Sequence, residues 1–451
     1  MRNRLAFAIA VVVGLSGTVA GSALQQASPA PSAEQRARAL VASLVKLDMD
    51  AVNAQFDDQL KSLLPPEGLR AAWAAALQQF GEFRRQTSAR TDTRGAITTV
   101  IVTCEFARQP ADVLVSYDGG GKVAGLFFRP ATPPYSPPAY AVPGAYTEED
   151  ITFGSPEWPL PGTLTIPAGG GPFPAVVLVH GSGPNDRDET VGANKPFKDL
   201  ALGLASRGVA ILRFDKRSKV YGAKLAAIPN FTVKEEAIDD ALAAVAKLRT
   251  TPRIDPSRIF VLGHSLGGTL VPRIAKGDAG IAGFIVMAGA VRPIEDAMLA
   301  QTRYLAMADG AISPAEQTMI DAMTTLGETV RKLTPADAAK PALISGAPAS
   351  YWLDLRGFDP AAAAIRVKAP MLILQGERDY QVTMTDDFSK WKAALDSTPT
   401  VTLKTYPALN HLFIPGSGPS LPAEHLAAGH VDEAVIRDIA AWIAGRRLLR
   451  P

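Results

Sequence analysis

Residues 258–268 read Arg-Ile-Phe-Val-Leu-Gly-His-Ser-Leu-Gly-Gly, and they indicate how the second half of the chain folds. An apolar, β-rich run ends in Gly-x-Ser-x-Gly and continues directly into a helix-compatible segment, residues 269–276. This strand–turn–helix context is typical of a nucleophile elbow, a sharp turn that exposes a serine hydroxyl above the end of a sheet. The flanking glycines leave room for the strained backbone that such a turn requires. We therefore predict Ser265 as a nucleophile, with the amide of Leu266 as one oxyanion-hole donor.

The first residues of the chain differ from the rest. Arg2 and Arg4 precede an apolar run at residues 5–15, and small residues continue to Ala23. This pattern predicts a secretory signal peptide over residues 1–23, cleaved after Ala20 or Ala23, and a periplasmic or extracellular location. The run is too short to serve as a stable membrane anchor.

The composition argues against several classes of partner. The chain has 451 residues, of which 47% are hydrophobic and 20% are charged, which predicts two or three ordinary globular domains. The signal peptide contains two of the 46 basic residues and none of the 44 acidic ones, so the mature formal charge is about zero. A neutral chain is a poor partner for nucleic acid or an anionic membrane. Cys104 is the one cysteine, so no intramolecular disulfide can form.

A small α+β domain is predicted over residues 33–130. Apolar residues recur at helical spacing up to about residue 80, and strand-like runs follow at 98–106, 112–117 and 123–128. Six prolines between residues 130 and 143 then predict a semi-rigid linker over residues 131–146. We expect the first domain to pack, dimerise or shape access to a site, with no chemistry of its own.

Residues 147–451 predict a mainly parallel sheet with helices on both faces, because strand and helix signals alternate along them. The expected strands are an opening antiparallel pair at 151–153 and 162–166, then 175–180, 209–214, the strand before Ser265, 281–287, 371–374 and 401–406. The expected helices include 197–206, 233–249 and 431–444.

An insertion of helical character, residues 293–363, separates two of these strands. It contains four of the nine methionines, and an exposed-looking pair, Tyr351-Trp352, lies near its end. We predict that it forms a cap over the active site, and we assign Tyr351, Trp352 and His180 to the substrate pocket. The alternative is a helical appendage packed away from the site.

A serine hydroxyl needs a base, and the base needs an acid partner that fixes its tautomer. His411 follows the last predicted strand, and Asp379 follows the strand at 371–374, with Glu377 as the alternative acid. In hydrolases built on an α/β sheet, the serine nucleophile comes first along the chain, then the acid and then the base. Ser265, Asp379 and His411 occur in that order.

The second oxyanion donor is expected in the loop His180-Gly181-Ser182-Gly183, from the amide of Ser182 or Gly183. The charged residues at 185–189 and 215–217 predict ion pairs between two loops, and a contact from Arg187 or Arg217 to a substrate carboxylate is the less favoured alternative. Neither metal-ligand spacing nor a dinucleotide fingerprint is present in the sequence, so we expect no cofactor.

Five motifs together resemble the EstD-type bacterial esterases of the α/β-hydrolase superfamily. They are HGSGPNDRDET at 180–190, RFDKRS at 213–218, GHSLGG at 263–268, LILQGERDYQV at 372–382 and NHLF at 410–413. The resemblance covers about residues 147–447, and many such proteins also have a small α+β domain before the hydrolase. It implies cofactor-free hydrolysis of carboxylic esters, with Ser265 as nucleophile, Asp379 as acid and His411 as base.

We accordingly expect an α/β-hydrolase fold with a helical cap and hydrolysis of small-molecule esters with short acyl chains through an acyl-enzyme. An exopeptidase or acyl-peptide hydrolase with the same triad is the first alternative. A non-enzymatic binding protein on a hydrolase scaffold is the second. The sequence does not indicate an oligomeric state.

Overall fold

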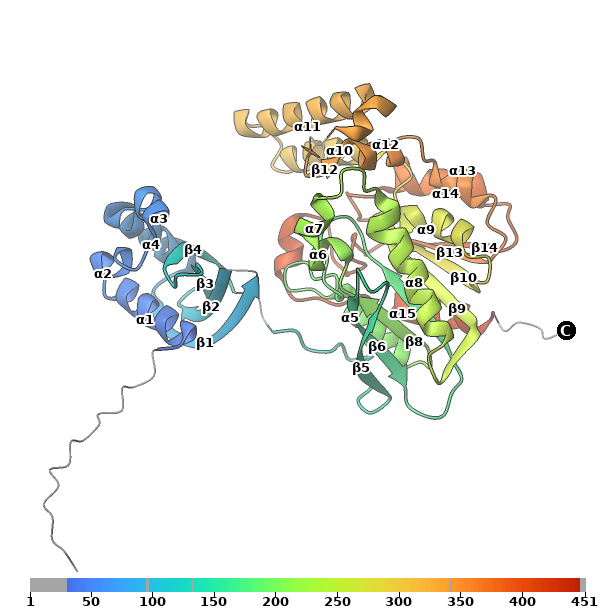
Figure 1. Ribbon diagram of the computed structural model, residues 1–451, viewed down its shortest axis with the longest axis horizontal. Helices are drawn as coiled ribbons and strands as arrows, with labels where there is room; N and C mark the ends of the chain where they lie inside the picture. Colours follow the sequence, from blue (N-terminus) through green and yellow to red (C-terminus); the bar gives the residue numbers. More distant parts are fainter. Residues whose placement is uncertain (1–30, 95–96, 132–133, 341–342, 447–451) are drawn as a thin grey trace, which may run out of the picture. The chain divides into compact units, whose positions relative to one another are not determined.

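The computed structural model describes residues 31–94, 97–131, 134–340 and 343–446, in two compact units that divide after residue 131 (Figure 1). Each unit is described by itself. The predicted signal peptide, residues 1–23, lies outside the described residues.

The first unit consists of helices followed by an antiparallel sheet. The helices are α1 (Ala33–Val45), α2 (Met49–Asn53), α3 (Asp58–Leu63) and α4 (Pro66–Phe80). The strands β1 (Phe83–Arg94), β2 (Ile97–Phe106), β3 (Ala111–Tyr117) and β4 (Val123–Pro130) pair in chain order. Alternate residues of β2 and β3 join α1 and α4 in one hydrophobic core.

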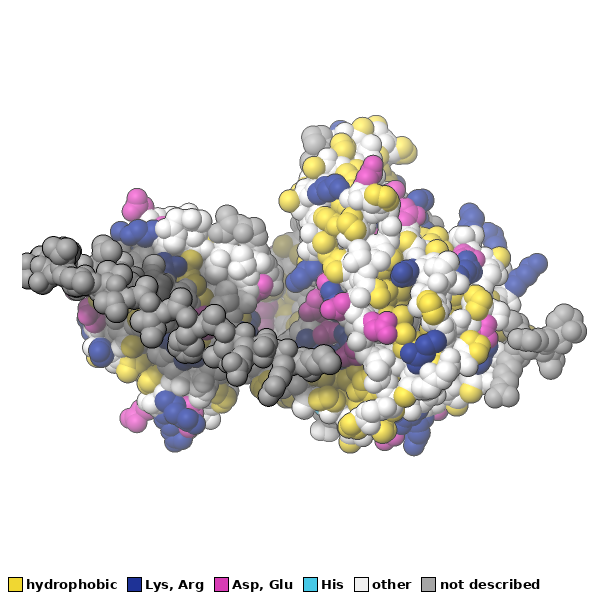
Figure 2. Space-filling model, turned by 60° about the horizontal axis from the view of Figure 1, so that its bottom comes forward, with side chains coloured by type: hydrophobic (Ala, Val, Ile, Leu, Met, Phe, Trp, Pro, Cys, Tyr) yellow, Lys and Arg dark blue, Asp and Glu magenta, His cyan; other side chains and the backbone are white. Residues whose placement is uncertain are grey.

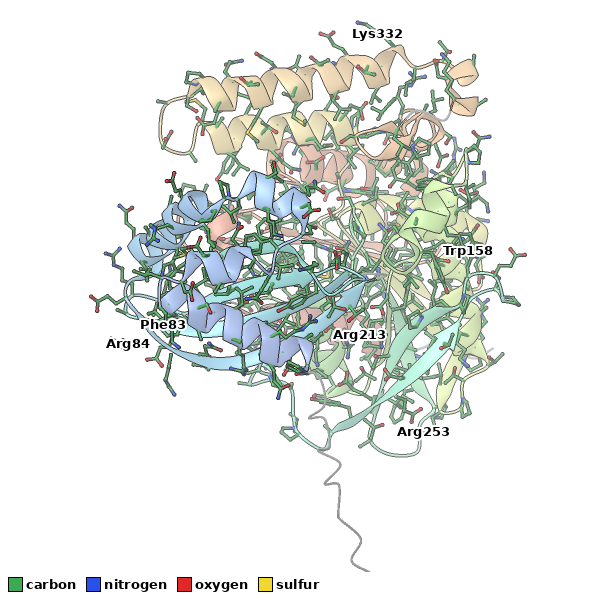
Figure 3. The ribbon with its side chains drawn as sticks, turned by 60° about the vertical axis from the view of Figure 1, so that its left-hand side comes forward. Phe83, Arg84, Trp158, Arg213, Arg253 and Lys332 are labelled. Carbon is green, nitrogen blue, oxygen red and sulfur yellow. The ribbon has the colours of Figure 1, made fainter. Side chains whose placement is uncertain are left out.

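The strand β1 was not predicted. Its sequence, FRRQTSARTDTR, has no apolar alternation after Phe83, because β1 is an edge strand that pairs with β2 alone. Phe83 at its start packs edge-on against Phe106, with ring centroids 5.6 Å apart, whereas the next residue, Arg84, pairs with Glu105 at the surface (Figure 3). Phe83 and Ala89 are the apolar residues of β1, and each is only partly buried against the core, which is too weak a signal for the hydrophobic pattern to predict the strand.

The second unit contains an eight-stranded sheet in the order β14-β13-β10-β9-β7-β8-β6-β5. Strand β5 (Tyr146–Phe153) is antiparallel to β6 (Leu160–Pro167), and β6 is antiparallel to β8 (Ala210–Phe214). The remaining pairs are parallel. They join β8 to β7 (Phe173–Val179), β9 (Ile254–His264), β10 (Gly283–Met287), β13 (Met371–Gly376) and β14 (Val401–Tyr406).

Helices cover both faces of this sheet, as the alternation of signals predicted (Figure 1). Along β9, Ile259 and Val261 join one core and Phe260 and Leu262 join the other, because successive strand residues face opposite sides. One face packs against α8 (Asp239–Arg249), α9 (Leu266–Gly277), α13 (Pro360–Ala364) and α14 (Ser389–Leu395). The other packs against α5 (Pro196–Ala205) and α15 (Glu433–Ala444).

Short helical segments complete the connections of the second unit. They are α6 (Arg217–Val220), α7 (Gly222–Ala226), the π-helical turns η1 (Lys234–Ile238) and η3 (Met384–Phe388), and the 3₁₀ turn η4 (Pro422–Leu426). The predicted helix at 233–249 therefore begins with the π-helical turn η1, which continues into α8.

The insertion between β10 and β13 is helical, with a small hairpin. It comprises α10 (Ile294–Ala306), α11 (Pro314–Lys332), η2 (Pro335–Ala339), β11 (Leu343–Ile344), β12 (Ala347–Pro348), α12 (Ala349–Leu355) and α13. Figure 3 shows Lys332 at the end of α11 pointing outward. Trp352 is not exposed as its sequence context suggested, because it packs with Leu326 and Val330 in a core of the insertion's own.

The surface carries both signs of charge. In Figure 2, lysine and arginine side chains are interspersed with acidic ones on the visible face. None of the helices in the described part of the chain is both long enough and apolar enough to cross a membrane.

Candidate active site

Ser265 occupies a strained turn between β9 and α9. Its backbone has φ 52° and ψ −118°, in the region that non-glycine residues rarely adopt. The turn is possible because two neighbours are glycines: a Cβ at Gly263 would overlap the backbone of Gly267, and one at Gly267 would overlap the backbone of Val179. The Ser265 amide donates to the Met287 carbonyl at 2.9 Å, which ties the turn to β10.

His411 and Asp379 form a buried pair. The Nδ1 atom of His411 lies 2.7 Å from Oδ2 of Asp379, and both side chains are shielded from solvent. Glu377, the alternative acid, is exposed and accepts a hydrogen bond from Thr405 instead. Among the described residues no hydrogen bond joins Ser265 Oγ to His411; such bonds are often long in unliganded sites and shorten when substrate binds.

The predicted oxyanion donors lie in one cavity with the nucleophile. Ser182, Gly183, Ser265 and Leu266 all line it. A Cβ placed on Gly181 would lie 3.6 Å from Ser265 Oγ, so this loop passes directly beside the hydroxyl. The Ser182 amide has no hydrogen-bond partner among the described residues, and the Leu266 amide, at the first position of α9, has none within its helix.

The insertion forms part of the cavity wall. The cavity has a volume of about 530 Å³, and its lining includes Ile294, Ala297, Met298, Tyr351, Trp352 and Leu355. Of the four methionines in the insertion, Met298 lines the cavity, whereas Met307 and Met319 are exposed. Trp352 thus belongs both to the insertion's core and to the wall of the cavity that contains Ser265.

The chain is similar to known proteins in both of its units. Residues 171–415 match the family described as serine aminopeptidase, S33, and residues 37–126 match a family described as a protein of unknown function, DUF3887. Over 411 residues the chain is 41% identical to Esterase EstD of Thermotoga maritima, covering 91% of this chain and 95% of that protein. The chain belongs to the EstD-type esterases of the α/β-hydrolase superfamily. The predicted fold class and the resemblance are therefore confirmed.

Solved structures are more distant from this EstD-type chain. Est1E from Butyrivibrio proteoclasticus is 17% identical with a TM-score of 0.43, covering 66% of this chain and 98% of that one. An esterase of Pyrobaculum calidifontis is 18% identical with a TM-score of 0.43, covering 68% and 88%. These likenesses are too weak to assign any role to a residue.

His180 does not lie with the other predicted pocket residues of the EstD-type chain. Its ring packs against Phe197 and Phe214, with centroids 5.0 and 5.3 Å away, and its Nε2 lies 3.1 Å from the Asp186 carbonyl. Burial lowers the pKa of His180 to about 4, so the imidazole is neutral at pH 7. The structure therefore places His180 in the core beneath the loop and not in the cavity wall.

A second buried pair of a histidine and a carboxylate, His264 and Glu189, lies next to the nucleophile. The sequence analysis did not predict it. His264 Nδ1 lies 2.9 Å from Oε2 of Glu189, and His264 Nε2 lies 2.9 Å from the His411 carbonyl. Oε1 of the same Glu189 accepts the Gly181 amide at 2.6 Å. One carboxylate thus joins the oxyanion loop to the elbow and, through His264, to the backbone of the base.

Burial would lower the pKa of His264, but the Glu189 carboxylate raises it above its ordinary value. Burial would likewise raise the pKa of Glu189, but His264 holds it below its ordinary value. Both groups therefore favour their charged forms.

The charged residues of the two loops form ion pairs, as predicted from the sequence. Arg187 pairs with Asp215 at 2.9 Å and Arg217 pairs with the buried Asp240. Neither arginine lines the cavity. Within the described ranges, groups of histidine, cysteine and acidic residues suited to hold a metal ion are absent.

Proposed function

We propose that the chain hydrolyses carboxylic esters with short acyl chains through a Ser265–His411–Asp379 triad and an acyl-enzyme. Two observations support the proposal: Ser265 occupies the strained turn after β9, and His411 and Asp379, from the loops after β14 and β13, form a pair at 2.7 Å. His264, the residue before Ser265, contacts the His411 carbonyl at 2.9 Å, which places these two segments side by side. Membership of an esterase family supports ester hydrolysis as the reaction.

In this mechanism Ser265 Oγ attacks the ester carbonyl while His411 Nε2 accepts the hydroxyl proton. Asp379 holds His411 in the tautomer with its proton on Nδ1 and stabilises the imidazolium that forms. The amides of Leu266 and Ser182 stabilise the oxyanion. The alkoxide leaves with the proton from His411, and water, activated by the same imidazole, then releases the acid and restores the Ser265 hydroxyl.

The cavity supports a small, mainly apolar acyl group. Its wall includes the apolar residues Ala290, Val291 and Ile294. The charged wall residues Arg292 and Glu236 are each paired, with Asp387 and Lys216. A volume of about 530 Å³ lies within the range of small-molecule sites.

The Ser265→Ala variant tests the proposal, with p-nitrophenyl acetate as substrate. Loss of the hydroxyl removes covalent catalysis and little packing, so hydrolysis should fall by at least about a hundredfold while the unfolding midpoint stays nearly unchanged. Ser257→Ala, an exposed serine on the same strand, is the matched control and should keep full activity. Residual activity of Ser265→Ala near that of wild type would refute the triad and favour a binding protein on a hydrolase scaffold.

A second candidate is an exopeptidase or acyl-peptide hydrolase, because the family matched by residues 171–415 is described as a serine aminopeptidase. The same triad would serve both reactions. Rates on a matched ester and amide with one acyl group decide between them: an ester rate that exceeds the amide rate by orders of magnitude supports the esterase.

We further propose that the chain is exported and loses residues 1–23. The charged start, the apolar run and the small residues before Ala23 support this. Mass spectrometry of the protein recovered from the periplasm or medium should give a mature chain that begins near residue 24, whereas an intact Met1 would contradict the proposal.

A further inference from the structure

Lys216 is a fully buried lysine that the proposed mechanism does not use. It follows β8, and 2% of its surface is exposed. An ammonium group in such a place costs free energy unless it is paired and hydrogen-bonded. Its Nζ donates to the carbonyl oxygen of Gly181 at 2.9 Å and lies 3.2 Å from Oε1 of Glu236. The charge is therefore directed at the loop that passes beside Ser265.

The carbonyl that Lys216 contacts belongs to the same peptide unit as the Ser182 amide. The Gly181–Ser182 bond is trans, so its N–H and C=O point in opposite directions. A donor that fixes the Gly181 carbonyl on one side consequently fixes the Ser182 N–H on the other. Ser182 lines the cavity with Ser265 and Leu266, and its amide donates to no atom of the residues that the structure describes.

We propose that Lys216 is a positioning residue for the oxyanion hole, which it serves by holding and polarising the Gly181–Ser182 peptide. The inference rests on the proposed function, in which the Ser182 amide stabilises the oxyanion. A charged donor on a peptide carbonyl makes the N–H of that peptide a stronger donor, because hydrogen bonds in a chain polarise one another.

The Gly181 residue is held from both sides. Its own N–H donates to Glu189 at 2.6 Å, while its carbonyl accepts from Lys216 and, at 3.2 Å, from Asn185. Because both ends of Gly181 are bonded to charged side chains, the loop cannot rotate the Ser182 amide away without breaking a buried charged hydrogen bond.

Glu236 links this arrangement to the insertion. It lies on the π-helical turn η1, lines the cavity, and accepts a hydrogen bond from the Tyr351 hydroxyl at 2.8 Å. Burial would raise the pKa of Glu236, but Lys216 and Tyr351 hold it below its ordinary value. A π-helical turn at such a place is typical of functional sites. The lysine that aligns the oxyanion donor thus shares its counter-charge with a cavity-lining residue of the insertion.

Lys216→Met tests the inference, because methionine has a similar length and no charge. The hydrolysis of p-nitrophenyl acetate should lose about 10–100-fold in kcat with KM changed less than about threefold, since the oxyanion is present in the transition state and absent from the bound ester. Butylboronic acid forms a tetrahedral adduct on serine, and its inhibition constant should rise by a comparable factor. A merely structural lysine would not weaken this transition-state mimic selectively.

Arg217→Met is the matched control. Arg217 is the next residue, forms a buried ion pair with Asp240 that the substitution removes, and stacks on Trp158 (labelled in Figure 3). It has no hydrogen bond to Gly181 among the described residues. It should show a lowered unfolding midpoint with kcat and boronate inhibition close to wild type. The inference is overturned if Lys216→Met loses no more kcat than this control, or if it loses kcat while the boronate binds as well as before.

If the single variant does not fold, Lys216→Met/Glu236→Gln removes the charge and its counter-charge together, which leaves no unpaired buried ion. The same loss of kcat and boronate affinity is expected, and full activity of the folded double variant overturns the inference. The Ser265→Ala variant distinguishes a failure of the role of Lys216 from a failure of the proposed function. If Ser265→Ala is inactive and Lys216→Met is fully active, only the role of Lys216 fails; if Ser265→Ala is active, the proposed function itself fails.

Discussion

At the scale of single residues, Asp379 has little freedom to move. Its Oδ1 accepts the amides of Gln381 and Val382 at 2.8 and 3.0 Å, and its Oδ2 accepts Gln375 at 3.2 Å besides contacting His411. The carboxylate is therefore held by its own loop before it meets the histidine. Because the loop already fixes the position of the carboxylate, its negative charge is the property that His411 requires for catalysis.

Asp379→Asn keeps the shape of the side chain and removes the charge, so it should lower kcat for p-nitrophenyl acetate by roughly 10³–10⁴-fold, the size of the effect when a triad acid is replaced by its amide. The cause is the wrong tautomer of His411, and the unfolding midpoint should change little. Glu377→Gln, in the same loop and exposed, should keep wild-type kinetics. Equal losses in both variants would mean that the acid is misassigned.

The Glu189–His264 pair makes a prediction about stability and pH. The folded pKa of His264 lies above its ordinary value of 6.5, so the pair's contribution is complete below pH 6.5 and is lost as pH rises through the folded pKa. The folded pKa of Glu189 lies below 4.5, so the same contribution is lost only in acid, as pH falls through that lower value.

His264→Gln removes the titrating group, so its unfolding midpoint should fall less than that of the wild type as pH rises from 6.5. Thermal unfolding of both proteins between pH 5 and 9 measures this. His180→Gln is the control, because the pKa of His180 is lowered to about 4 and its influence on stability lies between pH 4 and 6.5. Parallel curves for wild type and His264→Gln above pH 6.5 would contradict the charged pair.

At the scale of elements, local patterns predicted most of what positions the site. Ser265 stands between β9 and α9, and Asp379 and His411 lie in the loops that follow β13 and β14, so the order of the strands predicted which three residues to combine. Of these three, the structure joins His411 to Asp379 by a hydrogen bond. The edge strand β1 was not predicted, because most of its residues are polar and it pairs with β2 alone. Trp352 looked exposed because its partners, Leu326 and Val330, come from another helix of the insertion.

The contacts of Lys216 could not be predicted for a related reason. Its partners are Gly181 and Glu236, which lie 35 and 20 residues away, and nothing in the local pattern of residues 213–218 distinguishes Lys216 from Arg217. Buried charge pairs depend on how loops from different strands meet, and periodicity carries no information about that.

Trp352→Ala tests the insertion as an element. The indole packs in the insertion's core, and its Nε1 donates to the Ile344 carbonyl at 2.9 Å, so its loss should cost about 3–5 kcal/mol of unfolding free energy. Because Trp352 also lines the cavity, preference should shift towards longer acyl esters by roughly 1–3 kcal/mol, the value of a few methylenes.

Kinetics on C2 to C10 p-nitrophenyl esters, with the unfolding midpoint measured alongside, check both parts. Met319→Ala, an exposed residue of α11, should change neither. A lowered midpoint with an unchanged chain-length profile would show that Trp352 stabilises the insertion and does not select the substrate.

At the scale of the whole molecule, the chain contains separate hydrophobic cores. The core of the first unit includes residues between 37 and 126, and the two cores that sandwich the large sheet include none of them. Since each unit buries its own apolar residues, each should fold by itself.

A chain that begins at residue 134 should therefore hydrolyse p-nitrophenyl acetate with a kcat within a few-fold of the full chain. Calorimetry should show two unfolding transitions for the full chain and one for the shortened one. Ser265→Ala in the shortened chain is the control for residual hydrolysis. A shortened chain that folds but is inactive would give the first unit a part in the chemistry, contrary to our expectation from its sequence.

The glycines of the elbow have a consequence for how such an enzyme can diversify. No side chain fits at Gly263 or Gly267, because each faces backbone atoms of a neighbouring segment and not a movable side chain. The insertion offers the reverse situation: its residues meet the cavity through side chains that can be exchanged one at a time. Random mutagenesis followed by selection on new esters should therefore recover changes in residues 293–363 and almost none at the elbow. New substrate specificities would then arise through the insertion's part of the cavity wall, while the elbow residues are inherited unchanged.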